Sequence, residues 1–182
     1  MAGEEAPGAL EHVRVFVNTL DVEGGVDGLD DPGALAAFLR GRALVPHGTA
    51  ASGSELALAR ELREALRALL VHNAGAPLAP EALRVLDHVA ADLKMKARFS
   101  AHSVALDPEG SGVRVGLGRL LAIVADAMAD GTWPRLKACF RESCRWAFYD
   151  HARNRTGRWC SMAVCGNRTK AERYRARHAR GE

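Results

Sequence analysis

Residues 139–168 read CFRESCRWAFYDHARNRTGRWCSMAVCGNR, and this stretch contains all four cysteines of the 182-residue chain. They form two C-x4-C pairs, Cys139 with Cys144 and Cys160 with Cys165. Two short-spaced pairs on either side of a longer segment are typical of a tetrahedral zinc site, because the segment can fold back and bring the pairs together. The spacing therefore predicts one structural zinc ion, since four thiolates leave no open coordination position for chemistry.

Two other roles for the cysteines stay open at this stage. They could be small buried residues of a core, or they could form two disulfides. Disulfides are disfavoured because the N-terminal residues, MAGEEAPGALEHVRVF, carry glutamates where an export signal needs positive charge before an apolar run. No stretch reaches the ~18 apolar residues of a membrane span. We therefore expect a cytoplasmic protein without membrane association, whose thiols are reduced or bound to metal.

Basic residues are concentrated in the same part of the chain. Residues 133–182 contain thirteen Lys and Arg against four Asp and Glu, a formal charge of +9, whereas residues 1–132 carry −6. An acidic part joined to a strongly basic part is typical of a protein with one nucleic-acid-binding end and a separate domain with another task. The charge distribution thus predicts two domains, a body (residues 1–132) and a finger (residues 133–182).

The basic residues of the finger lie between the cysteine pairs and after the last cysteine. The stretch TKAERYRARHAR lacks Gly and Pro, so we expect a helix whose like charges a phosphate backbone would neutralise. The alternative is a solvated, frayed tail. Asn167 could instead cap this helix, and Arg168 could pack on Trp159. The candidate nucleic-acid contacts are Arg153, Arg155, Arg158, Asn167, Arg168, Lys170, Arg173, Arg175 and Arg177.

The aromatic residues suggest how the finger folds. Trp146 and Phe148 lie two apart, as on one face of a strand, so residues 146–149 and 157–160 could pair as a hairpin closed by DHARNRTG. A cysteine knuckle, a hairpin and a second pair leading into a helix follow the order of a treble-clef zinc finger. In so small a module, most aromatics are expected in the core rather than on bases.

The run from the first cysteine pair through RWAFYDHARNRTGRWCSMAVCGNRTKAERYRAR resembles the CGNR zinc finger, named for the motif present here at residues 165–168. The resemblance covers residues 133–178, although a small hydroxyl residue is common where this chain has His151. It implies that Cys139, Cys144, Cys160 and Cys165 are the metal ligands. Proteins similar to this one usually carry a mostly helical N-terminal domain and are described as stress-induced transcription regulators. The segment FVNTLD, residues 16–21, resembles the start of that domain.

The body shows several helical patterns. Residues 12–21 are ambiguous, because Val13, Val15 and Val17 alternate as in a strand while the resemblance favours a helix. Further helices are expected after Asp31-Pro32, from a Ser54 cap to about Gly75, from Pro80, and over residues 117–128. Residues 45–53 are expected to form a loop, and residues 98–106 could pair with 113–115 as a small hairpin. Gly131 and Pro134 mark the expected domain boundary.

Together these patterns predict a mainly α protein: a helical body with a small hairpin, followed by a small α+β, treble-clef-like finger. The body carries no catalytic signature, so an enzyme is not expected. Asn18 and Thr19 could line a ligand pocket, or they could cap or bond to backbone. The favoured function is a transcription regulator that binds DNA through the finger while the body senses an unidentified signal or forms a homodimer. The alternatives are an RNA-binding or ribosome-associated protein and a protein-interaction adaptor.

Overall fold

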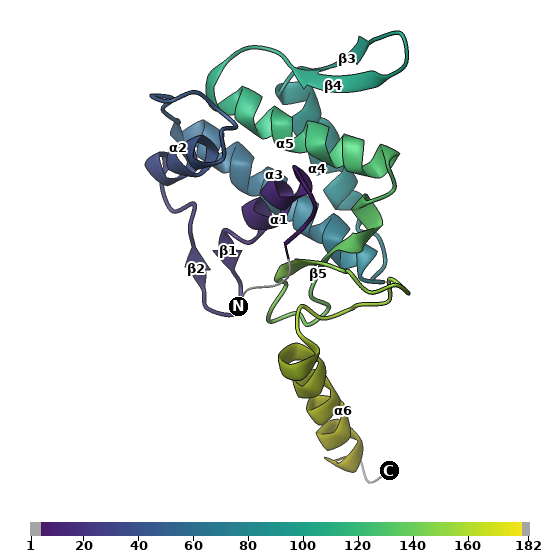
Figure 1. Ribbon diagram of the computed structural model, residues 1–182. Coiled ribbons are helices and arrows are strands. Elements are labelled where there is room, and N and C mark those ends of the chain that lie inside the picture. Colours follow the sequence, from purple (N-terminus) through teal and green to yellow (C-terminus); the bar gives the residue numbers. More distant parts are fainter. Residues whose placement is uncertain (1–4, 180–182) are drawn as a thin grey trace.

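The computed structural model describes residues 5–179, and the side chains of Arg173 and Ala179 lie outside the description. Helices dominate it and three two-stranded antiparallel sheets accompany them, which confirms the predicted mainly α fold class (Figure 1). The helices are α1 (Leu10–Val17), α2 (Pro32–Gly41), α3 (Gly53–Asn73), α4 (Pro80–Asp92), α5 (Gly112–Ala129) and α6 (Asn167–Ala179). The strands are β1 (Leu20–Asp21), β2 (Val26–Asp27), β3 (Met95–Phe99), β4 (Val104–Pro108), β5 (Leu136–Ala138) and β6 (Ala147–Tyr149).

Two helices of the body begin at side-chain caps. The Asp31 carboxylate accepts a hydrogen bond from the Ala34 amide at 2.8 Å, and Pro32 occupies the first turn of α2, as predicted. The predicted cap of α3 at Ser54 is wrong. Ser52 caps this helix, because its hydroxyl accepts a hydrogen bond from the Glu55 amide at 3.3 Å. The Glu55 carboxylate accepts one from the Ser52 amide at 2.8 Å, which completes a capping box.

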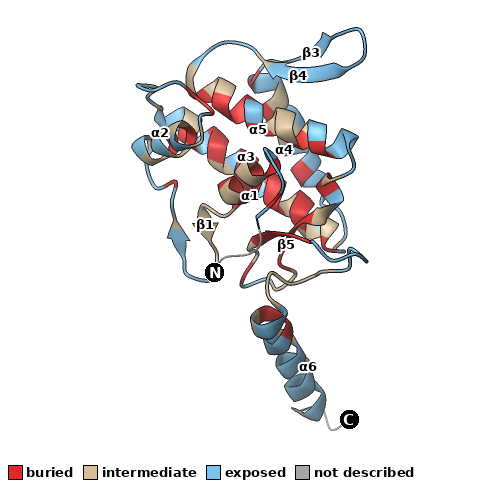
Figure 2. Cartoon of the chain, viewed as in Figure 1, coloured by how far each residue is buried: buried red, intermediate tan, exposed pale blue. Residues whose placement is uncertain are grey.

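The core of the body lies around α3. The α3 residues Leu62, Leu66 and Leu70 are fully buried, and they belong to one cluster with residues of α1 and α5. In α1, Val13 and Val17 are buried four residues apart whereas Val15 is only half-buried, so residues 12–17 are helical. The end of the ambiguous range differs, because Leu20–Asp21 form β1. Figure 2 shows the buried faces of these helices turned toward one another.

The hairpin of the body differs from the predicted one. Met95 pairs with Pro108 and Phe99 with Val104, so the turn lies at residues 100–103. Residues 113–115 are helical instead, because Val113 begins the buried stripe of α5 that continues at Leu117. The DPEGSG segment therefore leads from β4 into α5.

The finger also pairs differently from the prediction. Leu136 pairs with Tyr149 and Ala138 with Ala147, while residues 157–160 belong to no strand. The hairpin β5–β6 therefore encloses the loop that carries Cys139 and Cys144. The Phe140 amide of this loop donates a hydrogen bond to the Arg158 carbonyl of the later segment at 2.8 Å.

The finger's hairpin packs directly on the body. Five finger residues, Trp133, Leu136, Ala138, Ala147 and Tyr149, are buried in the same cluster as the helices of the body. The division into two domains near residue 132 stays a prediction, and the residues on either side of it share one core. Helix α6, in contrast, projects away from the rest of the molecule (Figure 1).

Candidate metal centre and basic surface

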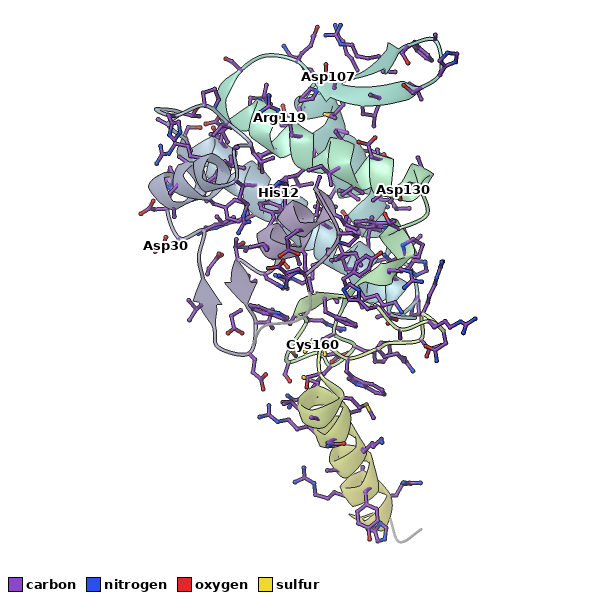
Figure 3. The ribbon with its side chains drawn as sticks, in the orientation of Figure 1. His12, Asp30, Asp107, Arg119, Asp130 and Cys160 are labelled. Carbon is purple, nitrogen blue, oxygen red and sulfur yellow. The ribbon has the colours of Figure 1, made fainter. Side chains whose placement is uncertain are left out.

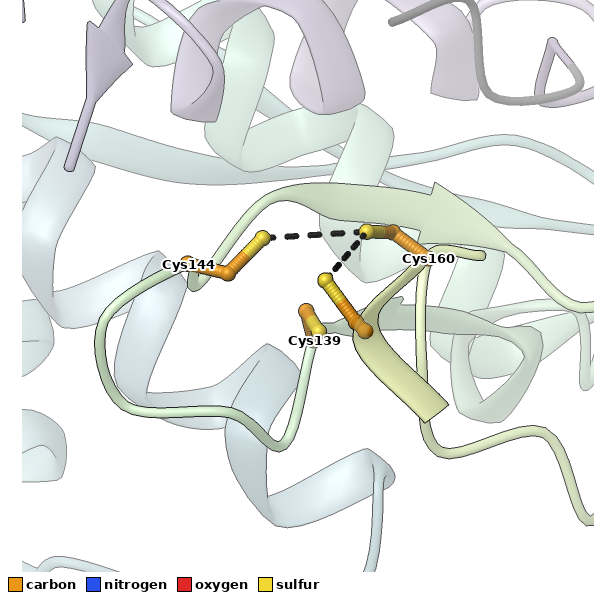
Figure 4. A group of neighbouring side chains, drawn as sticks. Cys139, Cys144 and Cys160 are labelled. Atoms are coloured by element: carbon orange, nitrogen blue, oxygen red, sulfur yellow. Dashed lines mark hydrogen bonds between the residues drawn. The ribbon is translucent and has the colours of Figure 1, made fainter. Parts of the chain in front are cut away.

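The four cysteine sulfurs converge at the junction between the body and α6, where Cys160 is labelled in Figure 3. All four lie within 4.8 Å of one another. The Cys160 sulfur is 3.7 Å from those of both Cys144 and Cys165 (Figure 4). A tetrahedral zinc ion with Zn–S bonds of ~2.3 Å places its sulfurs roughly 3.8 Å apart. The donor set and its spacing therefore fit one zinc ion.

Each half of the site is positioned by its backbone. Cys139 follows β5 directly and its amide donates to the Trp146 carbonyl at 2.9 Å, while the Cys144 amide donates to the Arg141 carbonyl at 3.0 Å. Cys165 lies in a π-helical turn, Met162–Gly166, that precedes α6. The Thr169 hydroxyl of α6 donates to the Cys165 carbonyl at 2.9 Å. The last zinc ligand is thus continuous with the first turn of α6.

The suggested capping role of Asn167 is wrong. The Ser161 hydroxyl accepts a hydrogen bond from the Val164 amide at 3.3 Å and so caps the helical segment one turn earlier. The Asn167 amide group instead donates to the Ala163 carbonyl at 3.1 Å. Asn167 is exposed, so part of its side chain faces solvent.

The thiols influence one another's ionisation. Hydrogen bonds from Cys144 and Cys160 lower the pKa of Cys139 to about 2. The reciprocal hydrogen bond with Cys139 raises the pKa of Cys144 to about 12, and hydrogen bonds with Cys139 and Cys144 raise the pKa of Cys160 as well. One thiolate therefore opposes ionisation of its neighbours, and a divalent cation relieves this opposition because it binds all of them as thiolates.

The site is closed. Cys139, Cys144 and Cys165 are buried, Cys160 is half-buried, and Trp146 and Trp159 pack against the cysteine cluster. A zinc ion with four thiolates in such surroundings has a structural role, because no position is left for a substrate. It would join the loop between β5 and β6, which supplies Cys139 and Cys144, to the segment that leads into α6, which supplies Cys160 and Cys165.

A buried ion pair lies beneath the basic loop at residues 150–157. The Lys137 ammonium donates to Asp150 at 2.7 Å and to the carbonyls of Arg155 and Gly157 at 2.6 and 3.0 Å, and both charged side chains are 4% exposed. Burial alone would raise the pKa of Asp150, but hydrogen bonds from Lys137, Gly157 and Ala152 outweigh it and hold this pKa below its usual range. The sequence analysis missed this anchor, although a lysine at the centre of an apolar strand is an available signal.

The structure separates the predicted basic residues into three groups. Arg153 and Arg155 are exposed on the loop above Lys137, and Lys170, Arg175 and Arg177 are exposed on α6. Arg158 lies over the Phe140 ring, 3.8 Å from its centroid, so one face of its guanidinium is covered. Arg173 lies in α6, but its side chain is outside the described part of the structure.

Arg168 has a partner that the sequence analysis did not predict. Its guanidinium donates to Glu23 of the body at 2.6 Å, and Arg141 of the finger donates to the same carboxylate oxygen at 3.0 Å. No contact with Trp159 is among the interactions described for Arg168, so the packing alternative gains no support.

Asn18 and Thr19 make hydrogen bonds within the protein. The Asn18 side chain donates to the Ala147 carbonyl at 2.9 Å and accepts from the Ala147 amide at 2.7 Å, which joins α1 to β6. The Thr19 hydroxyl donates to the Phe16 carbonyl and accepts from Arg63. These bonds match the alternative of backbone contacts, and a ligand pocket at this position stays a prediction.

Comparisons with known proteins address both halves of the chain. Residues 135–178 match the CGNR zinc finger family, and residues 13–131 match the ABATE family, described as "Putative stress-induced transcription regulator". A search of curated proteins found no match. Within residues 5–179, no helix is long and apolar enough to cross a membrane. The chain therefore belongs to the ABATE family and carries a CGNR zinc finger over residues 135–178.

Proposed function

We propose that this protein is a transcription regulator that binds double-stranded DNA through α6 and the basic loop at residues 150–157. The observation that carries the proposal is the geometry of α6. This helix projects from the molecule (Figure 1), and most of it is coloured as exposed in Figure 2. Its basic residues Lys170, Arg175 and Arg177 are exposed. Its first turn is tied to the zinc site through Cys165, so the metal would fix the direction in which the helix points.

The chemistry of the exposed groups favours the phosphate backbone. Guanidinium groups donate two hydrogen bonds to one phosphate, and neutralising phosphates releases condensed counterions. A single helix also fits the major groove of B-DNA. Stacking on unpaired bases is less favoured, because Trp133, Phe148 and Tyr149 are buried and contribute to the core.

The body would sense a signal, dimerise or do both. An open groove of about 530 Å³ between α3 and α4 supports sensing, because this volume suits a small molecule. Its lining combines Ala65, Ala68, Ala82 and Val85 with the charged residues Arg60, Glu61, Glu64 and Glu81. Dimerisation would add DNA affinity, since a single finger offers a limited contact area.

The test is a competition between two nucleic acids. The zinc-loaded full chain is titrated with a labelled duplex DNA at two salt concentrations, with a folded RNA hairpin as competitor. We expect affinity for the duplex that falls steeply with salt and a weaker effect of the hairpin. A stronger preference for the hairpin would favour RNA binding, and the absence of binding to both would leave an adaptor that contacts other proteins.

A further inference from the structure

One carboxylate of the body, that of Glu23, lies between two arginine side chains of the finger. Glu23, in the turn between β1 and β2, accepts hydrogen bonds through one oxygen from Arg168 (2.6 Å) and Arg141 (3.0 Å). Arg141 lies in the loop between the first two cysteines, and Arg168 lies in the first turn of α6. Two guanidinium groups that converge on one anionic oxygen are the arrangement that proteins use for both carboxylates and phosphates.

We propose that Arg141 and Arg168 form a phosphodiester-binding subsite beside the zinc centre, and that Glu23 fills this subsite in the free protein. The nucleic-acid part of this inference rests on the proposed function. The subsite itself is predicted to bind an oxyanion of the phosphate class. Arg141 adds a residue of the loop between Cys139 and Cys144 to the candidate contacts.

The Glu23 contact is not required to hold the finger on the body. Asn18 already joins α1 to Ala147, and Arg67 of α3 donates to the Arg145 carbonyl at 2.9 Å. Asn73 adds hydrogen bonds to the carbonyls of Trp133 (3.0 Å) and Leu136 (2.9 Å), next to the shared apolar core. If Glu23 served only to hold the finger on the body, its contact would therefore be redundant.

The hairpin that carries Glu23 is itself well anchored. At its base, Arg63 of α3 donates to both carboxylate oxygens of Asp27, at 2.5 and 2.9 Å. At its tip, the Asp21 carboxylate accepts a hydrogen bond from the Gly24 amide at 2.9 Å, one residue after Glu23. These bonds fix the turn and present the Glu23 carboxylate toward the finger.

The contact is also suited to reversible displacement. The side chains of Glu23 and Arg168 are 37% and 52% exposed, and ion pairs so open to water are weak. Arg141 is only 18% exposed, and Glu172 of α6 holds its other nitrogen at 3.3 Å. Arg141 would therefore keep its position when Glu23 leaves, and a phosphate that also meets the exposed cations of α6 would compete with one carboxylate.

The test follows the two arginine side chains directly. The zinc-loaded full chain is titrated with dimethyl phosphate, a model of the phosphodiester, while NMR records the Nε–Hε signals of Arg141 and Arg168, assigned with Arg141→Ala and Arg168→Ala. In Glu23→Gln, which keeps the shape of the side chain and removes its charge, we expect both signals to respond at concentrations roughly threefold to tenfold lower than in the wild type.

Glu142→Gln is the matched control. It removes the same charge one residue from Arg141, but the Glu142 side chain is 92% exposed and pairs with Arg145 at 3.7 Å. We expect it to titrate like the wild type. Equal behaviour of Glu23→Gln and Glu142→Gln, or responses confined to other arginines, would overturn the subsite.

A duplex titration separates this inference from the proposed function. Glu23→Gln should tighten duplex binding by a similar factor, and Arg141→Ala with Arg168→Ala should abolish that gain. A response to dimethyl phosphate without duplex binding by any variant would support the subsite and refute DNA binding. Duplex binding without a response of Arg141 and Arg168 to dimethyl phosphate would support DNA binding and refute the subsite.

Discussion

At the scale of residues, the fold of the finger depends on four thiolates and one buried ion pair. The sequence was sufficient to find the thiolates, because no cysteine lies outside the two pairs. It did not reveal that Lys137 supports the loop at residues 150–157 from below, because this depends on which segments pack together. The metal and the ion pair lead to separate predictions.

Replacing one ligand should release the metal. Cys165→Ser leaves three thiolates, so we expect zinc per purified chain to fall from about one to near zero and α6 to lose its fixed direction. Zinc content and tryptophan fluorescence measure the two effects, since Trp146 and Trp159 pack on the site. Ser143→Ala, on the exposed loop between Cys139 and Cys144, should keep its zinc; full zinc occupancy in Cys165→Ser would contradict the assignment.

Removing Lys137 should be costly, because the Asp150 carboxylate would remain buried without its cation. We expect Lys137→Met to lower the free energy of unfolding by about 3–5 kcal/mol, and Lys137→Met with Asp150→Asn to cost less. Urea unfolding measures both changes, with Lys170→Met on the exposed face of α6 as control. If Lys137→Met lowered the free energy of unfolding no more than Lys170→Met, the Lys137–Asp150 pair would not be important for stability.

The same pair should respond to acid. Because the pKa of Asp150 is lowered in the folded protein, its contribution is fully present above the unfolded pKa of about 3.9 and is lost as the pH falls through the folded pKa. The difference in unfolding free energy between wild type and Asp150→Asn should therefore be constant near neutral pH and shrink as the pH falls below about 5. Comparing the two proteins cancels the acid release of zinc, and a difference that stays constant in acid would exclude Asp150 as the titrating group.

At the scale of elements, α6 carries the functional prediction. If Arg177 contacts a phosphate, Arg177→Ala should reduce the slope of log affinity against log salt by about 0.9. Lys96→Ala is the control, because it removes a charge from the β3–β4 hairpin, far from α6 (Figure 1). Equal slopes for Arg177→Ala and the wild type would mean that Arg177 stays solvated.

The elements also show where sequence patterns suffice. Asp31-Pro32 and Pro80 mark helix starts because their effects are local. The sequence predicted residues 157–160 as the partner of β6, but β5 pairs with it instead, because strand pairing depends on packing in the core. Leu136 and Ala138 of β5 are buried in the core with α3, whereas residues 157–160 lie beside the zinc site. The cap at Ser52 was detectable, since Glu55 follows it at capping-box spacing.

At the scale of the whole molecule, the finger and the body are joined by polar as well as apolar contacts. Asn18→Ala leaves the buried amide and carbonyl of Ala147 without partners, so we expect a loss of about 1–3 kcal/mol in unfolding free energy. Asn154→Ala, on the exposed loop, should cost far less. Equal costs in urea unfolding would show that this joint contributes little.

The joint also bears on what the two parts can do together. The strands of the finger lie in the core of the body, so under the proposed function a rearrangement of α1 or α3 would be transmitted toward α6 through packed residues. This organisation was not visible in the sequence, where the charge difference between residues 1–132 and 133–182 indicates two separate units.

The most direct test maps the DNA footprint on the zinc-loaded full chain by backbone NMR. On addition of a duplex, we predict that the largest amide shifts fall in α6 and in the loop at residues 150–157, while the β3–β4 hairpin at the opposite end is unaffected. A footprint on the helices of the body, or no footprint under conditions in which the zinc site is intact, would contradict DNA binding through the finger.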